Sequence, residues 1–86
     1  LKRIVIGEKG AGFGRDAIRL LKRVVFEEWG KHRLWLDVME HNDRARNLYR
    51  SEGFIEEGVW RDAFYRNGEY VSLVFMSILE NEYHSQ

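Results

Sequence analysis

A glycine-rich segment between a β-branched run and an amphipathic stretch constrains the fold of this chain more than any other feature. Ile4, Val5 and Ile6 are typical of a short buried strand. Residues 7–14 then form a loop with glycines at alternate positions, and from residue 15 the apolar residues recur at helical spacing. The apolar face of this helix comprises Ile18, Leu21, Val25 and Trp29, joined by Ala17 and Val24, whereas the charged residues fall largely elsewhere: Arg15, Arg19, Lys22, Arg23 and Glu27. Gly30 is a natural end for the helix.

The rest of the chain continues the alternation of strands and helices. Leu34–Met39 alternates as a second strand, and a right-handed helical crossover would place it parallel to the first. Asn42 or Asp43 can cap a short second helix, which ends at Gly53. Its predicted inner face consists of Ala45, Leu48 and Tyr49.

A hairpin is predicted for the last third of the chain. A third strand runs from Phe54 to about Arg61, and Asn67-Gly68 favours a tight turn because both turn positions need positive φ. The long apolar strand 70–79 should be central or covered on both faces. We therefore predict an α/β (α+β) fold, a single domain over 1–86. Its mixed sheet has about four strands, the first two parallel and the last two an antiparallel hairpin, with two helices.

Composition narrows the class of protein. Lysine plus arginine and aspartate plus glutamate each total 14, and this zero net charge argues against partners that are nucleic acids or anionic membranes. The chain has no cysteine, which excludes disulfides, thiolate metal sites and a thiol nucleophile, and which fits a cytoplasmic protein. No apolar run approaches the ~20 residues of a membrane span. The histidines, His32, His41 and His84, show no metal spacing, so no metal site is expected.

The glycine loop is suited to phosphate binding. Glycine lets backbone amides approach a ligand, and the first-turn amides of the following helix are unsatisfied and carry the positive end of its dipole. Lys9 and Arg15 could add positive charge. A plain flexible turn is the alternative. A Walker loop is excluded because Arg15-Asp16 stands where Lys-Ser/Thr is needed, and the even spacing of the glycines fits a dinucleotide fingerprint poorly, although Asp37 lies roughly 20 residues on.

Two motifs carry a resemblance to a known family. Residues 42–54, NDRARNLYRSEGF, resemble the signature Asn-x-x-Ala-x-x-Leu-Tyr-x-x-x-Gly-Phe of the GNAT-superfamily N-acetyltransferases. Residues 9–14, KGAGFG, resemble the superfamily's cofactor loop, and the resemblance covers essentially all 86 residues. Within the superfamily the chain is most similar to the spermidine/diamine and ribosomal-protein-type acetyltransferases, on residues 64–70 and 76–78.

The resemblance implies acetyl transfer from acetyl-coenzyme A to an amine, borne by a small molecule or a protein N-terminus. It implies that Asn42 contacts the pantetheine arm and that Tyr49 is the general acid beside the sulfur. A phenol of ordinary pKa about 10 is protonated at neutral pH and can supply the proton that a leaving thiolate needs. The residues implied to bind the cofactor are Lys9, Gly10, Ala11, Gly12, Phe13, Gly14, Arg15, Asn42 and Asn47.

Simpler roles stay open for several of these residues. Tyr49 can be an ordinary core aromatic, and Asn42 can be a helix cap and a ligand contact at once. Asp37 is a candidate general base, as is Glu40, although a solvated strand end is the plainer interpretation of each. The loop before Gly10 is about two residues shorter than is usual in the family, and Lys9 stands where Gln or Arg is expected.

The resemblance also implies that the chain is the C-terminal, cofactor-binding half of the family's domain. The N-terminal half is expected to supply much of the acceptor pocket. The first strand would then present an open edge, which an N-terminal segment, a homodimer or a partner chain must cover. The alternative function is a catalytically silent module that binds coenzyme A or a protein partner through that edge.

Overall fold

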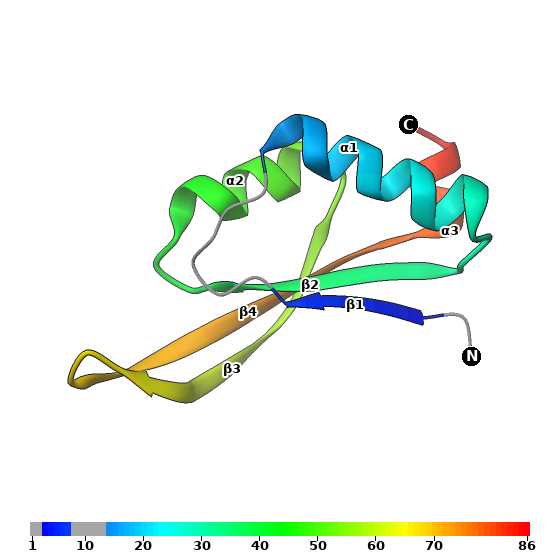
Figure 1. Cartoon of the computed structure of the whole chain (residues 1–86). Coiled ribbons are helices and arrows are strands. Elements are labelled where there is room, and N and C mark those ends of the chain that lie inside the picture. Colours follow the sequence, from blue (N-terminus) through cyan, green and yellow to red (C-terminus); the bar gives the residue numbers. More distant parts are fainter. Residues whose placement is uncertain (1–2, 8–13) are drawn as a thin grey trace.

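The computed structural model describes residues 3–7 and 14–86, and its centre is a four-stranded sheet (Figure 1). The strands are β1 (Arg3–Gly7), β2 (Arg33–Met39), β3 (Ile55–Arg66) and β4 (Glu69–Leu79), in the order β1-β2-β4-β3. The β1 strand is parallel to β2, and β4 is antiparallel to both of its neighbours, β2 and β3. The predicted mixed sheet, with its parallel first pair and its final hairpin, is therefore confirmed.

Two helices lie on the same side of this sheet (Figure 1). They are α1 (Arg15–Arg23), which continues as the π-helical segment η1 (Val24–Glu28), and α2 (Asp43–Ser51). Their buried side chains pack against alternate residues of β2 and β4. This core consists of Ile18, Val25, Phe26, Leu34, Leu36, Val38, Ala45, Tyr49, Phe54, Val74, Met76 and Ile78. Within the described ranges, 3–7 and 14–86, none of the helices is both long and apolar enough to cross a membrane.

The π-helical segment corrects the predicted face of the first helix. The Trp29 amide donates to the Val24 carbonyl at 2.9 Å, five residues back, so this turn holds more residues than an α-helical turn. The wider turn rotates the following side chains, with the result that Phe26 is buried and Trp29 is 54% exposed. The expectation that Trp29 belongs to the core was wrong. Gly30 ends the helix with a φ of +61°, as predicted.

The predicted turn of the hairpin is confirmed, but the strand before it is longer than predicted. Asn67 and Gly68 have φ of +51° and +82°, as the tight turn requires. However, β3 extends to Arg66 rather than ending near Arg61, with register shifts between Glu56 and Gly58 and between Trp60 and Phe64. The β4 strand is central, as predicted.

A third helix was not predicted. The five-residue helix α3 (Glu80–His84) follows β4 directly. The Glu82 carboxylate accepts a hydrogen bond from the Leu79 amide at 2.9 Å, and the Tyr83 ring stacks on Phe26 at 5.0 Å. The C-terminal end of the chain is thereby attached to the end of the first helix.

The sheet face opposite the helices carries aromatic side chains. Trp35 on β2 and Phe75 on β4 alternate with core residues, so they point away from α1 and α2. Their ring centroids are 5.1 Å apart, and Trp60 of β3 lies 4.7 Å from Phe75 with 63% of its surface exposed. This face therefore combines aromatic rings with polar side chains of β2, Arg33 and Asp37, and the described residues cover it only partly.

Candidate functional site

A groove separates the start of α1 from the outer side of α2. Its volume is about 760 Å³. The described residues that line it are Gly14, Arg15, Asn42, Arg44, Ala45, Asn47, Leu48 and Ser51. Gly14 is the last residue of the glycine motif and six of the others belong to the second motif, so the fold brings the end of the first motif and the second motif to one surface.

The first wall of the groove is the amino-terminal end of α1. Gly14 is the N-cap, with an extended backbone, and its carbonyl accepts the first helical hydrogen bond from Ile18 at 3.0 Å. Gly14 has no side chain that could cap this end, and the first-turn amides have no acceptor within the helix. A Cβ built on Gly14 would meet no atom within 4 Å. As far as the described residues show, the space beside this end of the helix is open, which is the arrangement that an approaching phosphate needs.

The second wall is α2, and its start is fixed by Asn42. The Asn42 side chain accepts a hydrogen bond from the Ala45 amide at 3.2 Å, and its backbone amide donates to the Met39 carbonyl at 2.9 Å. The cap predicted from the sequence is thus present, and the same residue lines the groove. Asn47, one turn further on, also lines the groove and accepts a hydrogen bond from Arg50 at 2.7 Å.

The predicted site residues divide into three groups. Gly14, Arg15, Asn42 and Asn47 line the same groove. Tyr49 and Asp37 are not among the described residues that line it. The others lie outside the described residues: Lys9, Gly10, Ala11, Gly12 and Phe13.

Tyr49 lies on the inner side of α2. Its side chain is fully buried, and its ring centroid is 6.0 Å from that of Phe54. Asp37 is half-buried on β2 and alternates with the core residues Leu36 and Val38, so it points toward the opposite face of the sheet. The catalytic roles assigned to Tyr49 and Asp37 therefore stay predictions.

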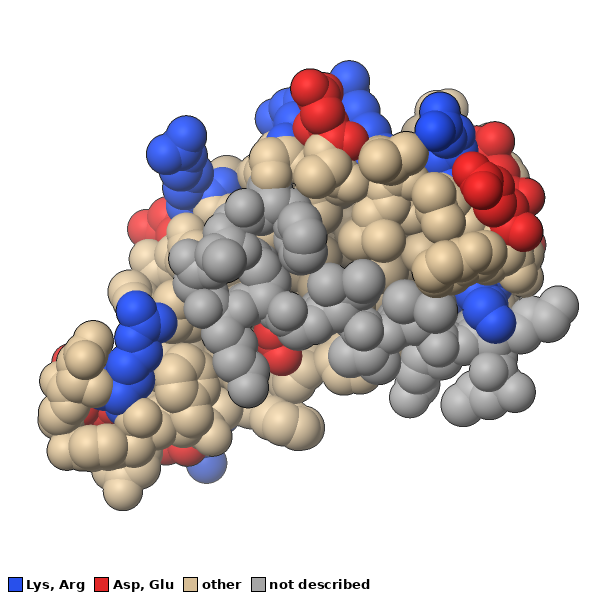
Figure 2. Space-filling model, in the orientation of Figure 1, with Lys and Arg blue, Asp and Glu red and all other residues tan. Residues whose placement is uncertain are grey.

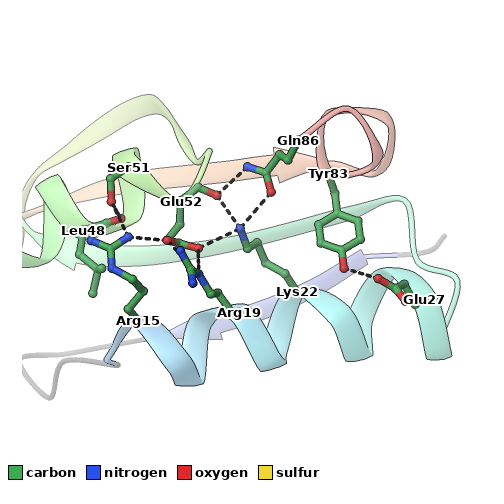
Figure 3. A network of polar contacts seen from close by, with 9 residues as sticks. All are labelled: Arg15, Arg19, Lys22, Glu27, Leu48, Ser51, Glu52, Tyr83 and Gln86. Atoms are coloured by element: carbon green, nitrogen blue, oxygen red, sulfur yellow. Dashed lines mark hydrogen bonds and ion pairs between the residues drawn. The ribbon is translucent and has the colours of Figure 1, made fainter.

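A buried carboxylate beside the groove was missed at the level of sequence. Glu52, which directly follows α2, is 5% exposed and contacts three cations of α1 (Figure 3). Arg15 Nη1 donates to one oxygen of this carboxylate, Arg19 Nε lies 3.1 Å from the other, and Lys22 Nζ lies 3.2 Å from it. Burial raises the pKa of the Glu52 carboxyl, but the hydrogen bonds from Arg19, Arg15 and Lys22 outweigh it and hold this pKa below its ordinary value.

The position of Lys22 corrects another expectation. The sequence placed it with the charged residues away from the apolar face, yet it is 4% exposed. Its ammonium donates to the Glu52 carbonyl at 2.7 Å and to the Gln86 side chain at 3.1 Å, which compensates its burial. The signal for this cluster was available in the spacing of Arg15, Arg19 and Lys22, which puts three cations on one side of a helix.

The outer surface carries charges of both signs. In the view of Figure 2, lysine and arginine side chains along the helices alternate with acidic ones. On the exposed side of α2, Arg46 and Arg50 contact the Glu56 carboxylate at 3.0 and 2.9 Å. Hydrogen bonds from Arg46 and then Arg50 hold the pKa of Glu56 below its ordinary value. Among the described residues, no three His, Cys, Asp or Glu side chains gather as metal ligands would.

Comparison with known proteins supports the family resemblance that the two motifs indicated. Residues 7–54 match the model of the acetyltransferase (GNAT) family. The chain is 35% identical over 75 residues to the spermidine N(1)-acetyltransferase of Vibrio cholerae serotype O1. The alignment covers 87% of this chain and 43% of that protein. It is 33% identical over 78 residues to a putative ribosomal N-acetyltransferase of Bacillus subtilis. This alignment covers 91% of this chain and 43% of that protein.

Solved structures agree with this relationship. The dodecameric structure of spermidine N-acetyltransferase from Vibrio cholerae superposes with a TM-score of 0.79 at 35% identity, over 86% of this chain and 43% of that one. The chain thus spans less than half the length of these relatives. The family match covers both groove-forming segments and extends over more than half of the sequence. This chain belongs to the GNAT acetyltransferase family.

Proposed function

We propose that the protein is an N-acetyltransferase that transfers the acetyl group of acetyl-coenzyme A to an amine. The observation that carries the proposal is the groove, which joins the uncapped start of α1 to the polar outer side of α2. One end offers backbone amides and the positive Arg15 side chain, which suit a diphosphate, and the other offers the amide side chains of Asn42 and Asn47, which suit the amides of a pantetheine arm.

The fit between groove and cofactor rests on the protein's own geometry. Among the described residues, no atom lies within 4 Å of a Cβ built on Gly14, so none of their side chains blocks a phosphate there. Asn42 uses its side-chain oxygen for the helix cap, so its NH₂ group can donate to a ligand carbonyl. The two roles that the sequence left open for Asn42 are compatible.

We assign the proton transfers to Tyr49 and Asp37. Acetyl-coenzyme A supplies a thioester; the amine nitrogen forms the new bond to its carbonyl carbon and the carbon–sulfur bond breaks. The Tyr49 hydroxyl would give its proton to the departing thiolate, and Asp37 is the candidate acceptor of the amine proton, through water. The proposal for Tyr49 rests on its place in the family motif and on its position on the helix that forms the groove.

The acceptor is proposed to be an amine-bearing small molecule or a protein N-terminus. The names of the two relatives point to a polyamine and to a ribosomal protein. Turnover with spermidine and with a peptide that has a free N-terminus distinguishes them, because each probe offers only one of the two kinds of amine.

Replacement of Tyr49 by phenylalanine tests the mechanism. Loss of a general acid lowers turnover by about a hundredfold or more, while the affinity for coenzyme A stays within about twofold. Tyr65→Phe is the matched control, because Tyr65 lies on the hairpin with 64% of its surface exposed. Steady-state kinetics and calorimetry with coenzyme A provide the two readouts.

The results separate the two functions that the sequence allows. Turnover that is unchanged in Y49F removes Tyr49 from the mechanism. A protein that binds coenzyme A but acetylates no amine is the silent module. A protein that does not bind coenzyme A contradicts the enzyme and the coenzyme-A-binding module, and leaves a module that binds a protein partner at the sheet edge.

A further inference from the structure

Glu52 is a buried acid with no role in the chemistry proposed above. It lies at the carboxyl end of α2, where its carboxylate is almost inaccessible to solvent. Of the three cations around it, only Arg15 also lines the groove. We propose that Glu52 is a positioning residue, which holds the Arg15 guanidinium ready for a phosphate of coenzyme A; this inference rests on the proposed function.

The contacts of Arg15 suggest how it would be held. Its Nη1 atom donates to the Glu52 carboxylate and, at 3.1 Å, to the Ser51 hydroxyl (Figure 3). Ser51 in turn donates to the Leu48 carbonyl at 2.6 Å, so both acceptors are fixed to the last turn of α2. Among the described residues, Arg15 makes these contacts through Nη1 alone. The N–H groups on Nη2 and Nε then remain for an anion, because a guanidinium is a planar fork with five donors.

Whether Glu52 strengthens or weakens phosphate binding depends on how far it pre-organises the Arg15 side chain. A free arginine side chain loses rotamer entropy when a ligand immobilises it, and an arginine that the protein already holds avoids that cost. Removal of Glu52 has an opposing effect, because the loss of a negative charge raises the positive potential beside the groove. Because the Arg15 side chain is 46% exposed, salt weakens this change of potential at the groove, whereas it does not change the orientation of the fork. Near physiological ionic strength we therefore expect Glu52 to strengthen phosphate binding.

Lys22 and Arg19 complete the cluster without reaching the groove. Lys22 is held by Glu52 and Gln86 and is almost fully buried. Arg19 contacts both oxygens of the same carboxylate, at 3.1 and 3.3 Å, but is not among the described residues that line the groove. Arg19 is consequently a matched control for Arg15, since it has the same partner on the same helix.

The experiment measures the affinity of coenzyme A in the full-length protein at about 0.15 M and about 0.5 M salt. Glu52→Gln and Arg15→Lys are each expected to weaken binding by about tenfold. A lysine at position 15 keeps the positive charge. Its single ammonium group cannot contact Glu52 and at the same time offer parallel N–H donors to a phosphate, as a guanidinium can. Arg19→Lys is expected to bind as the wild type does. In the R15K background, E52Q should weaken binding by less than about twofold, because the residue it positions is already gone.

Kinetics distinguish positioning from a general loss of structure. In E52Q the KM for acetyl-coenzyme A should rise, while kcat and the KM for the amine stay unchanged. If E52Q does not fold, R15K against R19K can still overturn the inference, because the inference requires Arg15 to meet the phosphate and neither variant removes the buried carboxylate. Equal or tighter binding of coenzyme A by R15K or by E52Q overturns the inference and leaves the proposed function intact. A wild-type protein that does not bind coenzyme A overturns the proposed function as well.

Discussion

At the scale of single residues, the charge of Glu52 makes stability depend on pH. Because its pKa is lowered in the folded protein, its contribution is present above the ordinary value of 4.5 and is lost as the pH falls through the folded pKa. Removal of one partner of a buried ion pair usually lowers the free energy of unfolding by about 3–5 kcal/mol. We expect the low end of this range, roughly 3 kcal/mol, because Arg15 and Arg19 are themselves about half exposed. We expect E52Q to be less stable than the wild type by that amount at pH 7.

Denaturant unfolding at several pH values measures this difference. The gap between wild type and E52Q should narrow as the pH falls below the ordinary value of 4.5 and through the lowered folded pKa, because the wild-type carboxylate then also becomes neutral. Glu56→Gln is the control: its two arginine contacts lie at the surface, so its loss costs less than about 1 kcal/mol. A gap that does not change with pH would show that Glu52 acts through packing and not through charge.

The residues also show which features a sequence reveals. Asn42 and the Asn67-Gly68 turn were predictable because cap and turn preferences are local. The burial of Lys22 was not, because the group that neutralises it is Glu52, which lies 30 positions away in the chain. Periodicity identifies an inner face, but it does not show which charge on that face will find a distant partner.

At the scale of elements, the π-helical segment decides which aromatic residue stabilises the first helix. A continuous α-helix would place Trp29 inward, but the wider turn buries Phe26 against Tyr83 instead. Phe26→Ala is therefore expected to cost about 3–4 kcal/mol, and Trp29→Ala less than about 1 kcal/mol. The free energy of unfolding of both variants checks this, and the reverse order would mean that the helix is regular in solution. An extra residue in one turn leaves no mark on the 3.6-residue pattern, which is why the sequence predicted a regular helix.

At the scale of the whole molecule, one face and one edge of the sheet are incompletely covered. The face opposite the helices carries Trp35, Trp60 and Phe75, and β1 ends the sheet on one side. Two donors on this face, Arg33 Nε and Trp35 Nε1, are buried without a hydrogen-bond partner among the described residues. Exposed aromatic patches and open edges both favour association. We therefore still expect another segment or another copy to cover β1.

The 86-residue chain on its own should consequently associate as its concentration rises. Sedimentation velocity over a range of concentrations measures this directly. Trp60→Lys should shift the chain toward monomer, because it places a charge on the aromatic face, where the exposed Trp60 packs edge-on against Phe75. Tyr70→Lys is the control, since Tyr70 is equally exposed but lies at the tip of the hairpin, away from that face. A monomer at all concentrations would show that these aromatics tolerate water, and a loss of association in Y70K alone would place the contact on the hairpin.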